Sequence, residues 1–118
     1  MLLERYLITG VVLPSVQDMM EMILSVLENY PPQVVRLLMN HIGTHDTERA
    51  ITVLAGEPMC NRGREWQCSC KMTKEQWKVG LKKMRLASLM QYTLPGVPCI
   101  YYGDEAGVEG YKDPFNRT

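Results

Sequence analysis

The sequence has no excess of either charge and no long apolar run. Thirteen Lys and Arg residues balance thirteen Asp and Glu residues among 118 positions, so we expect no electrostatic attraction to nucleic acid or to an anionic membrane. No stretch approaches the roughly 18 apolar residues of a membrane span. Glu4 and Arg5 interrupt the apolar N-terminal stretch, which lacks the basic region followed by an apolar segment that a signal peptide needs. We therefore expect a cytoplasmic protein with no nucleic-acid partner and no membrane partner.

Four cysteines are present, and their spacing is typical neither of a zinc site nor of a disulfide framework. Cys60, Cys68 and Cys70 form C-x7-C-x-C, whereas paired zinc thiolates usually stand two to four residues apart. Cys99 lies in an apolar stretch, where a free thiol packs as a small hydrophobe. The sequence thus indicates reduced cysteines without a metal, and nothing in it implies a cofactor. A thiol-based metal or redox module is the alternative.

Two helices are predicted by signals at both of their ends. Ser15 and Asp18 fit a variant of the capping box, and the two prolines at 31 and 32 stop the helix that follows. Thr73 and Gln76 form a second capping box before a long helix that ends at "LPG". Apolar residues recur along the first helix at intervals of three and four, which predicts one apolar face: Val16, Met19, Met20, Ile23, Leu24 and Leu27.

Two short apolar segments are predicted to be strands. The first covers about Leu37–Ile42 and precedes a short helix that starts near Asp46 or Thr47 and ends at Gly56. The stretch between Gly56 and the second long helix is predicted to be an irregular loop. The second strand, "VPCIYY" from Val97, is nearly all apolar, as expected of a parallel strand covered on both faces. The order predicts an α/β fold with a right-handed crossover between two parallel strands.

Polar residues follow both predicted strands. In α/β proteins, ligands and catalytic groups gather at the carboxyl ends of parallel strands. Carboxylates there suit an uncharged sugar, because they accept hydroxyl hydrogen bonds and stabilise an oxocarbenium-like transition state. Simpler alternatives remain, since Asp46 also fits a helix N-cap and His45 a hydrogen-bonded structural histidine. The residues concerned are His45 and Asp46 after the first strand, and Asp104, Glu105, Glu109, Asp113 and Arg117 after the second.

Taken together, these motifs resemble a known family. "GTHDTERA" resembles the segment after the seventh strand of the catalytic barrel in the α-amylase family, glycoside hydrolase family 13. "QYTLPGVPCIYYGDEAGVEG" resembles the eighth strand and its loop, and "KDPFNR" is similar to a stretch in the neopullulanase, cyclomaltodextrinase and maltogenic amylase branch. The resemblance implies that residues 1–118 are one partial domain, the C-terminal part of a (β/α)8 TIM barrel with about strands 7 and 8 and their flanking helices.

The resemblance also implies roles for individual residues. Asp46 matches the carboxylate that stabilises the transition state, and His45 matches a histidine that hydrogen-bonds the sugar beside the scissile bond. Asp113 and Arg117 match a pair that holds a more distant glucose unit. The implied partner is an α-glucan oligosaccharide, cut with retention of configuration. Thr44 is a mild departure, because family members usually carry Ser or Asn before the His-Asp pair.

A larger departure is the lack of the other two catalytic carboxylates. A retaining glycosidase needs a nucleophile and an acid about 5–5.5 Å apart. In this family they follow the fourth and fifth strands, and nothing in residues 1–35 resembles either motif. We therefore expect a part of an α-glucan hydrolase that is inactive alone and self-associates through exposed barrel edges. The alternative is a free-standing, non-catalytic module for carbohydrate binding or protein interaction, derived from the barrel.

Overall fold

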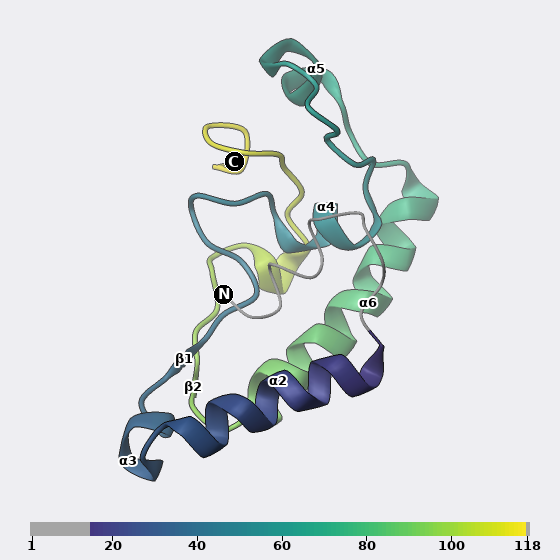
Figure 1. Cartoon of the computed structure of the whole chain (residues 1–118). Coiled ribbons are helices and arrows are strands. Elements are labelled where there is room, and N and C mark those ends of the chain that lie inside the picture. The colour runs from purple at the N-terminus through teal and green to yellow at the C-terminus, as the bar shows by residue number, and fades with distance from the viewer. Residues whose placement is uncertain (1–14, 118) are drawn as a thin grey trace.

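The computed structural model describes residues 15–117, so the N-terminal stretch with Glu4 and Arg5 lies outside the described residues (Figure 1). Helices dominate, and a small sheet joins two segments that are far apart in the sequence. Within residues 15–117, no helix combines the length and the apolar character required to cross a membrane. The elements are α2 (Val16–Asn29), α3 (Pro32–Val35), β1 (Met39–Asn40), α4 (Ala50–Ala55), α5 (Arg64–Ser69), α6 (Lys74–Thr93), β2 (Val97–Pro98) and the 3-10 turn η1 (Asp104–Ala106).

The predicted pairing of two parallel strands is confirmed. β1 and β2 lie side by side, with Met39 opposite Val97 and Asn40 opposite Pro98 (Figure 1). Both strands are much shorter than predicted, since each has only two residues in the ladder. The prediction that the second strand is covered on both faces is wrong for this chain, because the Val97 side chain is about half exposed.

Two side-chain amides hold the register of this short sheet. The buried Gln91 Nε2 on α6 donates to the carbonyl oxygens of Asn40 and Cys99, both at 2.8 Å. Asn40 Nδ2 in turn donates to the carbonyl oxygens of Leu94 and Pro95 at 3.1 and 3.2 Å. These bonds tie the end of α6 to both strands. They therefore fix where the chain leaves each strand and enters the following loop.

The two long helices begin as predicted. At α2 the Ser15 side chain accepts from the Asp18 amide while the Asp18 carboxylate accepts from the Ser15 amide. At α6 Thr73 and Gln76 form the same reciprocal arrangement. Each box satisfies amides that otherwise lack partners in the first turn of a helix. The confirmed starts show that local sequence alone determines these two helix ends.

The prolines at 31 and 32 follow the end of α2, as predicted, and Pro32 also opens α3, where its fixed φ suits the first helical position. Two other predictions about the helices were wrong. The segment between Gly56 and α6 is not irregular throughout, because it contains α5. The short helix after β1 starts at Ala50 and not at Asp46 or Thr47, although Gly56 is its C-cap as predicted.

The buried core is small and lies between α4 and α6. It consists of Ala50, Ile51 and Met84, with partly buried apolar residues around it. α2 has no buried residue, and much of its apolar face is exposed. The Cα radius of gyration of 15.0 Å exceeds the roughly 13.5 Å that the scaling for a compact domain of this length gives. The chain therefore leaves apolar surfaces that its own elements do not cover.

Candidate functional site

The loop after β1 presents His45 and Asp46 on a tight turn. The Thr44 amide donates to Thr47 Oγ1 at 3.2 Å, and the Thr47 amide donates to the Thr44 carbonyl at 3.4 Å. His45 Nε2 lies 3.3 Å from Asp46 Oδ1, and the two side chains are 64% and 77% exposed. The N-cap of α4 is Arg49, which makes no side-chain capping bond. Asp46 is therefore not the N-cap of this helix, and the simpler explanation of its position is wrong.

The hydroxyl of Thr47 explains why the helix starts late. This hydroxyl is used within the Thr44–Thr47 turn and caps no helical amide. The Arg49 amide donates to the Gly110 carbonyl at 2.8 Å, so the chain is held by a contact from the far loop. The helical pattern begins only when the Val53 amide reaches the Arg49 carbonyl.

The loop after β2 turns sharply and returns across the start of α4. Gly103 and Gly107 flank η1 with φ of 85° and 69°, a left-handed conformation that favours glycine. The loop then continues to a turn in which Arg117 Nε lies 2.6 Å from Asp113 Oδ1, and both side chains are half exposed. The peptide bond between Asp113 and Pro114 is cis. This turn presents an ion pair at the surface, and the loop after β1 presents the His45–Asp46 pair there.

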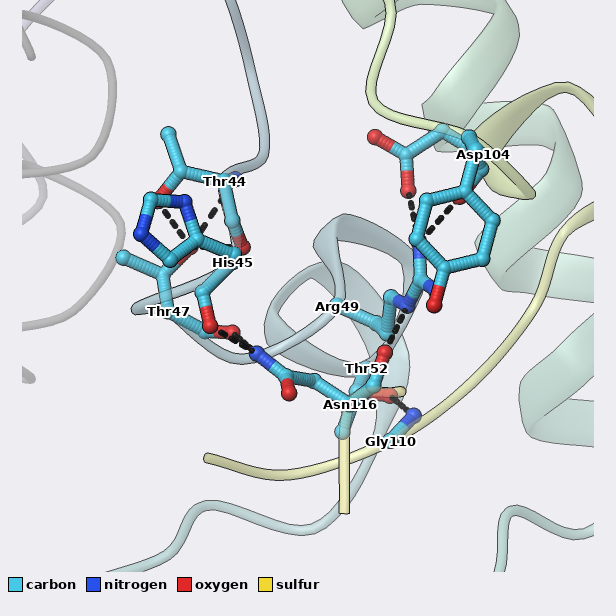
Figure 2. A network of polar contacts seen from close by, with 9 residues as sticks. Thr44, His45, Thr47, Arg49, Thr52, Asp104, Gly110 and Asn116 are labelled. Atoms are coloured by element: carbon cyan, nitrogen blue, oxygen red, sulfur yellow. Dashed lines mark hydrogen bonds and ion pairs between the residues drawn. The ribbon is translucent and has the colours of Figure 1, made fainter. Parts of the chain in front are cut away.

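Asn116 joins the two loops (Figure 2). Its side chain is fully buried, and its Nδ2 donates to the carbonyl oxygens of His45 and Thr47, both at 2.7 Å. Next to it, the Gly110 amide donates to Thr52 Oγ1 at 2.9 Å. The loop after β2 is thus bound both to the Asp46 turn and to the start of α4.

A buried ion pair lies beneath this junction. Arg49 Nε donates to the Asn116 carbonyl at 2.7 Å, and Arg49 Nη1 donates to the Tyr102 carbonyl (Figure 2). Arg49 Nη1 also lies 3.5 Å from Asp104 Oδ1, with the two side chains 0% and 4% exposed. A Cβ on Gly43 would lie 2.8 Å from Asp104 Oδ2, so a larger residue would press on the carboxylate. Arg49 therefore connects the first loop to both halves of the second.

Burial sets the electrostatics of two carboxyl groups near the site. Burial raises the pKa of Asp104, and the nearby Arg49 charge offsets only part of this effect. Burial also raises the pKa of Glu48, against the attraction of Lys112. Among residues 15–117, Asp104 Oδ1 and Oδ2, Arg49 Nη2 and Asn116 Oδ1 are buried and make no hydrogen bond. Several polar atoms of the Arg49–Asp104 ion pair and of Asn116 are therefore buried without a hydrogen-bond partner in the described part of the chain.

The described residues offer no obvious metal centre. No three His, Cys, Asp or Glu side chains within residues 15–117 are grouped so that they could hold an ion. The four cysteines are free, and Cys70 Sγ lies 3.4 Å from the hydroxyl of Tyr111. Glu109, one of the acids after the second predicted strand, accepts a bond from the Met72 amide at 2.7 Å and so anchors the chain before α6.

The structure brings together the four residues that the sequence singles out, although their roles stay predictions. His45 with Asp46 and Asp113 with Arg117 form two surface pairs on loops joined by Asn116. The sequence reasoning missed the two buried residues that hold these loops, Arg49 and Asn116. Both stand inside quoted motifs, "GTHDTERA" and "KDPFNR", which was the one signal available.

Comparison with known proteins identifies relatives over most of the chain. Residues 6–118 match the family described as the alpha amylase catalytic domain. The chain is 41% identical over 95 residues to an amylopullulanase of Thermoanaerobacter thermohydrosulfuricus, covering 80% of this chain and 6% of the relative. It is 34% identical over 103 residues to a cyclomaltodextrinase of Geobacillus thermopakistaniensis, covering 87% and 14%. It is 36% identical over 88 residues to neopullulanase 2 of Thermoactinomyces vulgaris, covering 75% and 11%. The chain thus spans only a small part of the length of each of these proteins.

Proposed function

Because this chain belongs to the α-amylase catalytic-domain family, we propose that it forms the C-terminal part of a (β/α)8 barrel in a retaining α-glucan hydrolase. Its β1 and β2 would be about the seventh and eighth strands. The parallel pairing of the two strands supports this placement, as do the exposed apolar faces of β2 and α2. The substrate would be an α-1,4-linked glucan such as starch, maltodextrin, pullulan or cyclodextrin.

The observation that carries the proposal is the junction of the two loops. Asn116 holds the turn bearing His45 and Asp46 against the turn bearing Asp113 and Arg117. Carboxyl ends of neighbouring parallel strands are where barrel enzymes bind their substrates. The His45–Asp46 and Asp113–Arg117 pairs are both exposed, so a glucan chain lying across the two loops could touch them at once.

The chemistry of each residue follows from its charge and position. Asp46 would stabilise the positive charge that develops on the sugar ring in the transition state. His45 would donate a hydrogen bond to the sugar next to the scissile bond. Asp113 would accept hydroxyl hydrogen bonds from a more distant glucose, and Arg117 would donate to its oxygens. Asp46 cannot replace a nucleophile and an acid, so this chain would bind glucan without cutting it.

The apolar surfaces would also make the chain self-associate. Edge strands expose amide and carbonyl groups that can pair with another chain, and a two-stranded sheet is marginal in water. The uncovered face of α2 adds further exposed apolar area. We propose that copies of the isolated chain cover these surfaces for one another.

A titration of the 118-residue chain with maltotriose tests the proposal. We expect backbone amide NMR signals of residues 45–47 and 113–117 to shift together, while the sugar itself stays uncleaved. Asp113→Ala should weaken binding, whereas the same change at the exposed Glu105 on the neighbouring turn should not. Cellotriose, which has β-linkages, is the control ligand. Equal shifts with both sugars, or release of glucose that Asp46→Asn abolishes, would contradict the proposal.

A further inference from the structure

We propose that Asn116 is a positioning residue, which fixes the turn carrying Asp46 relative to the Asp113–Arg117 pair. The claim about position stands on the hydrogen bonds of the chain alone. Its functional meaning rests on the proposed function, in which Asp46 and the Asp113–Arg117 pair act on one glucan chain. Asn116 itself does not touch the sugar in this proposal, because its side chain is fully buried.

One amide group holds the carbonyl groups of both residues that flank Asp46 in the sequence. The two hydrogens of Asn116 Nδ2 are used by the carbonyl oxygens of His45 and Thr47, each at 2.7 Å. The backbone is therefore fixed on both sides of Asp46, while the Asp46 side chain stays 77% exposed. A carboxylate that stabilises a transition state needs a fixed backbone and a carboxyl group that the substrate can reach.

The other side of Asn116 is anchored as firmly. Its carbonyl accepts from Arg49 Nε at 2.7 Å, and Arg49 is fully buried against Asp104. Along the chain, Asn116 stands next to Arg117 and three residues after Asp113. The same residue thus belongs to the turn that would hold the distant glucose and bonds to the turn that bears Asp46. Asn116 therefore sets the distance between the His45–Asp46 pair and the Asp113–Arg117 pair.

No other side chain of similar size can make these contacts. Two carbonyl oxygens face the group, so it must be a double donor, and the amide NH₂ is the only such group of this length. An aspartate would place an acceptor against two acceptors. A glutamine would push the NH₂ one methylene too far into a site where Asn116 has no exposed surface.

Amide hydrogen exchange on the 118-residue chain separates positioning from general anchoring. Asn116→Asp removes the double donor, and Thr52→Val removes another bond that holds the same loop, the one from the Gly110 amide to Thr52 Oγ1. We expect Asn116→Asp to speed exchange at the Thr44 and Thr47 amides at least tenfold more than at the amides of α6. Thr52→Val should change exchange at Thr44 and Thr47 no more than in α6. Equal effects of the two variants on the turn would overturn the proposal.

If Asn116→Asp does not fold, Asn116→Ser gives the same comparison, because it keeps one donor on a shorter side chain. We expect an intermediate effect on Thr44 and Thr47. Wild-type exchange at both amides in a folded Asn116→Ser chain would overturn the proposal.

A maltotriose titration of the same variants distinguishes the positioning role of Asn116 from glucan binding by the chain. We expect roughly tenfold weaker binding in Asn116→Asp and nearly unchanged binding in Thr52→Val. Wild-type affinity in a folded Asn116→Asp chain would overturn the positioning role while leaving glucan binding intact. A wild-type chain that binds no maltotriose, yet shows the predicted exchange difference, would overturn the proposed function and support the positioning role.

Discussion

The guanidinium group of Arg49 lies 3.5 Å from the carboxylate of Asp104, and both side chains are almost completely removed from solvent. Burial disfavours the ionised form of the Asp104 carboxyl group, and the nearby Arg49 charge favours it. The pKa of Asp104 is raised, so the effect of burial is the larger of the two. The folded chain therefore holds the Asp104 proton more tightly than the unfolded chain does. Its ionisation costs stability.

The pH dependence of unfolding should report this cost. The wild-type free energy of unfolding should fall as pH rises from the ordinary aspartate pKa of 3.8 through the raised pKa of Asp104. Asp104→Asn should lack this decrease, although it should be less stable at pH 7, by about 3 kcal/mol, because Arg49 loses its counter-charge. Urea unfolding between pH 3 and 7 measures both effects. Glu21→Gln, which changes an exposed acid on α2, is the control, and an unchanged slope in Asp104→Asn would contradict the assignment.

Packing between α4 and α6 should make one glycine sensitive to enlargement. A Cβ on Gly80 would lie 2.6 Å from Ile51 Cγ1 in the buried core. Glycine to alanine normally stabilises a helix by about 1 kcal/mol, but overpacking costs about 1–3 kcal/mol. We expect Gly80→Ala to destabilise the chain by roughly 1–2 kcal/mol in thermal or urea unfolding. Gly63→Ala, at the N-cap of α5 with no atom within 4 Å of the new Cβ, should cost only about 0.5 kcal/mol, the usual difference between glycine and alanine at an N-cap. A more stable Gly80→Ala chain would show that the helices lie further apart.

The exposed face of α2 should drive self-association of the isolated chain. Val16, Met20 and Leu24 are among its exposed apolar residues. At micromolar concentration, light scattering should give a mass of at least two chains, with roughly 1,200 Å² or more buried between them. Leu24→Glu should lower this mass, and Gln17→Glu, which adds the same charge to an already polar position, should not. A well-dispersed wild-type monomer would favour the free-standing module over the partial barrel.

Kinetics of a completed barrel would separate the roles of the two surface pairs. With the remaining strands supplied by a relative, Asp46→Asn should lower kcat by at least a hundredfold with little change in KM. Asp113→Ala should instead raise KM for longer oligosaccharides. The difference would follow because, in the proposed function, Asp46 would act on the transition state and Asp113 on ground-state binding. Steady-state rates on maltotriose and maltohexaose measure it, and equal effects of the two variants on both parameters would refute the assignment.

The sequence was informative where structure depends on neighbours in the chain. The capping boxes at Ser15 and Thr73 use partners three residues away, so both helix starts were predictable. The start of α4 was not, because it depends on the Gly110 carbonyl and on a turn that occupies the Thr47 hydroxyl. The predicted strands were longer than the observed ones. An apolar run indicates strand residues but not which of them pair with a neighbouring strand.

The site was predictable to the level of its surface residues only. His45, Asp46, Asp113 and Arg117 were found through motifs, and the structure places them on two joined loops. The contribution of Asn116 depends on contacts across about seventy residues, which no local pattern indicates. Arg49 was not singled out from the sequence, because nothing local shows that this arginine is fully buried.

The reciprocal bonds of Asn40 and Gln91 have a consequence for how such chains can be recombined. They set the strand register through side chains of this chain alone, and the contacts of Arg49 and Asn116 set the loops in the same way. Residues 38–117 therefore contain all of these side chains and their partners in one continuous segment. A gene crossover placed between Asn40 and Gln91 would pair each amide with a foreign partner and shift the two loops apart. A crossover placed before Leu38 would transfer the loops after β1 and β2 together with the bonds that hold them.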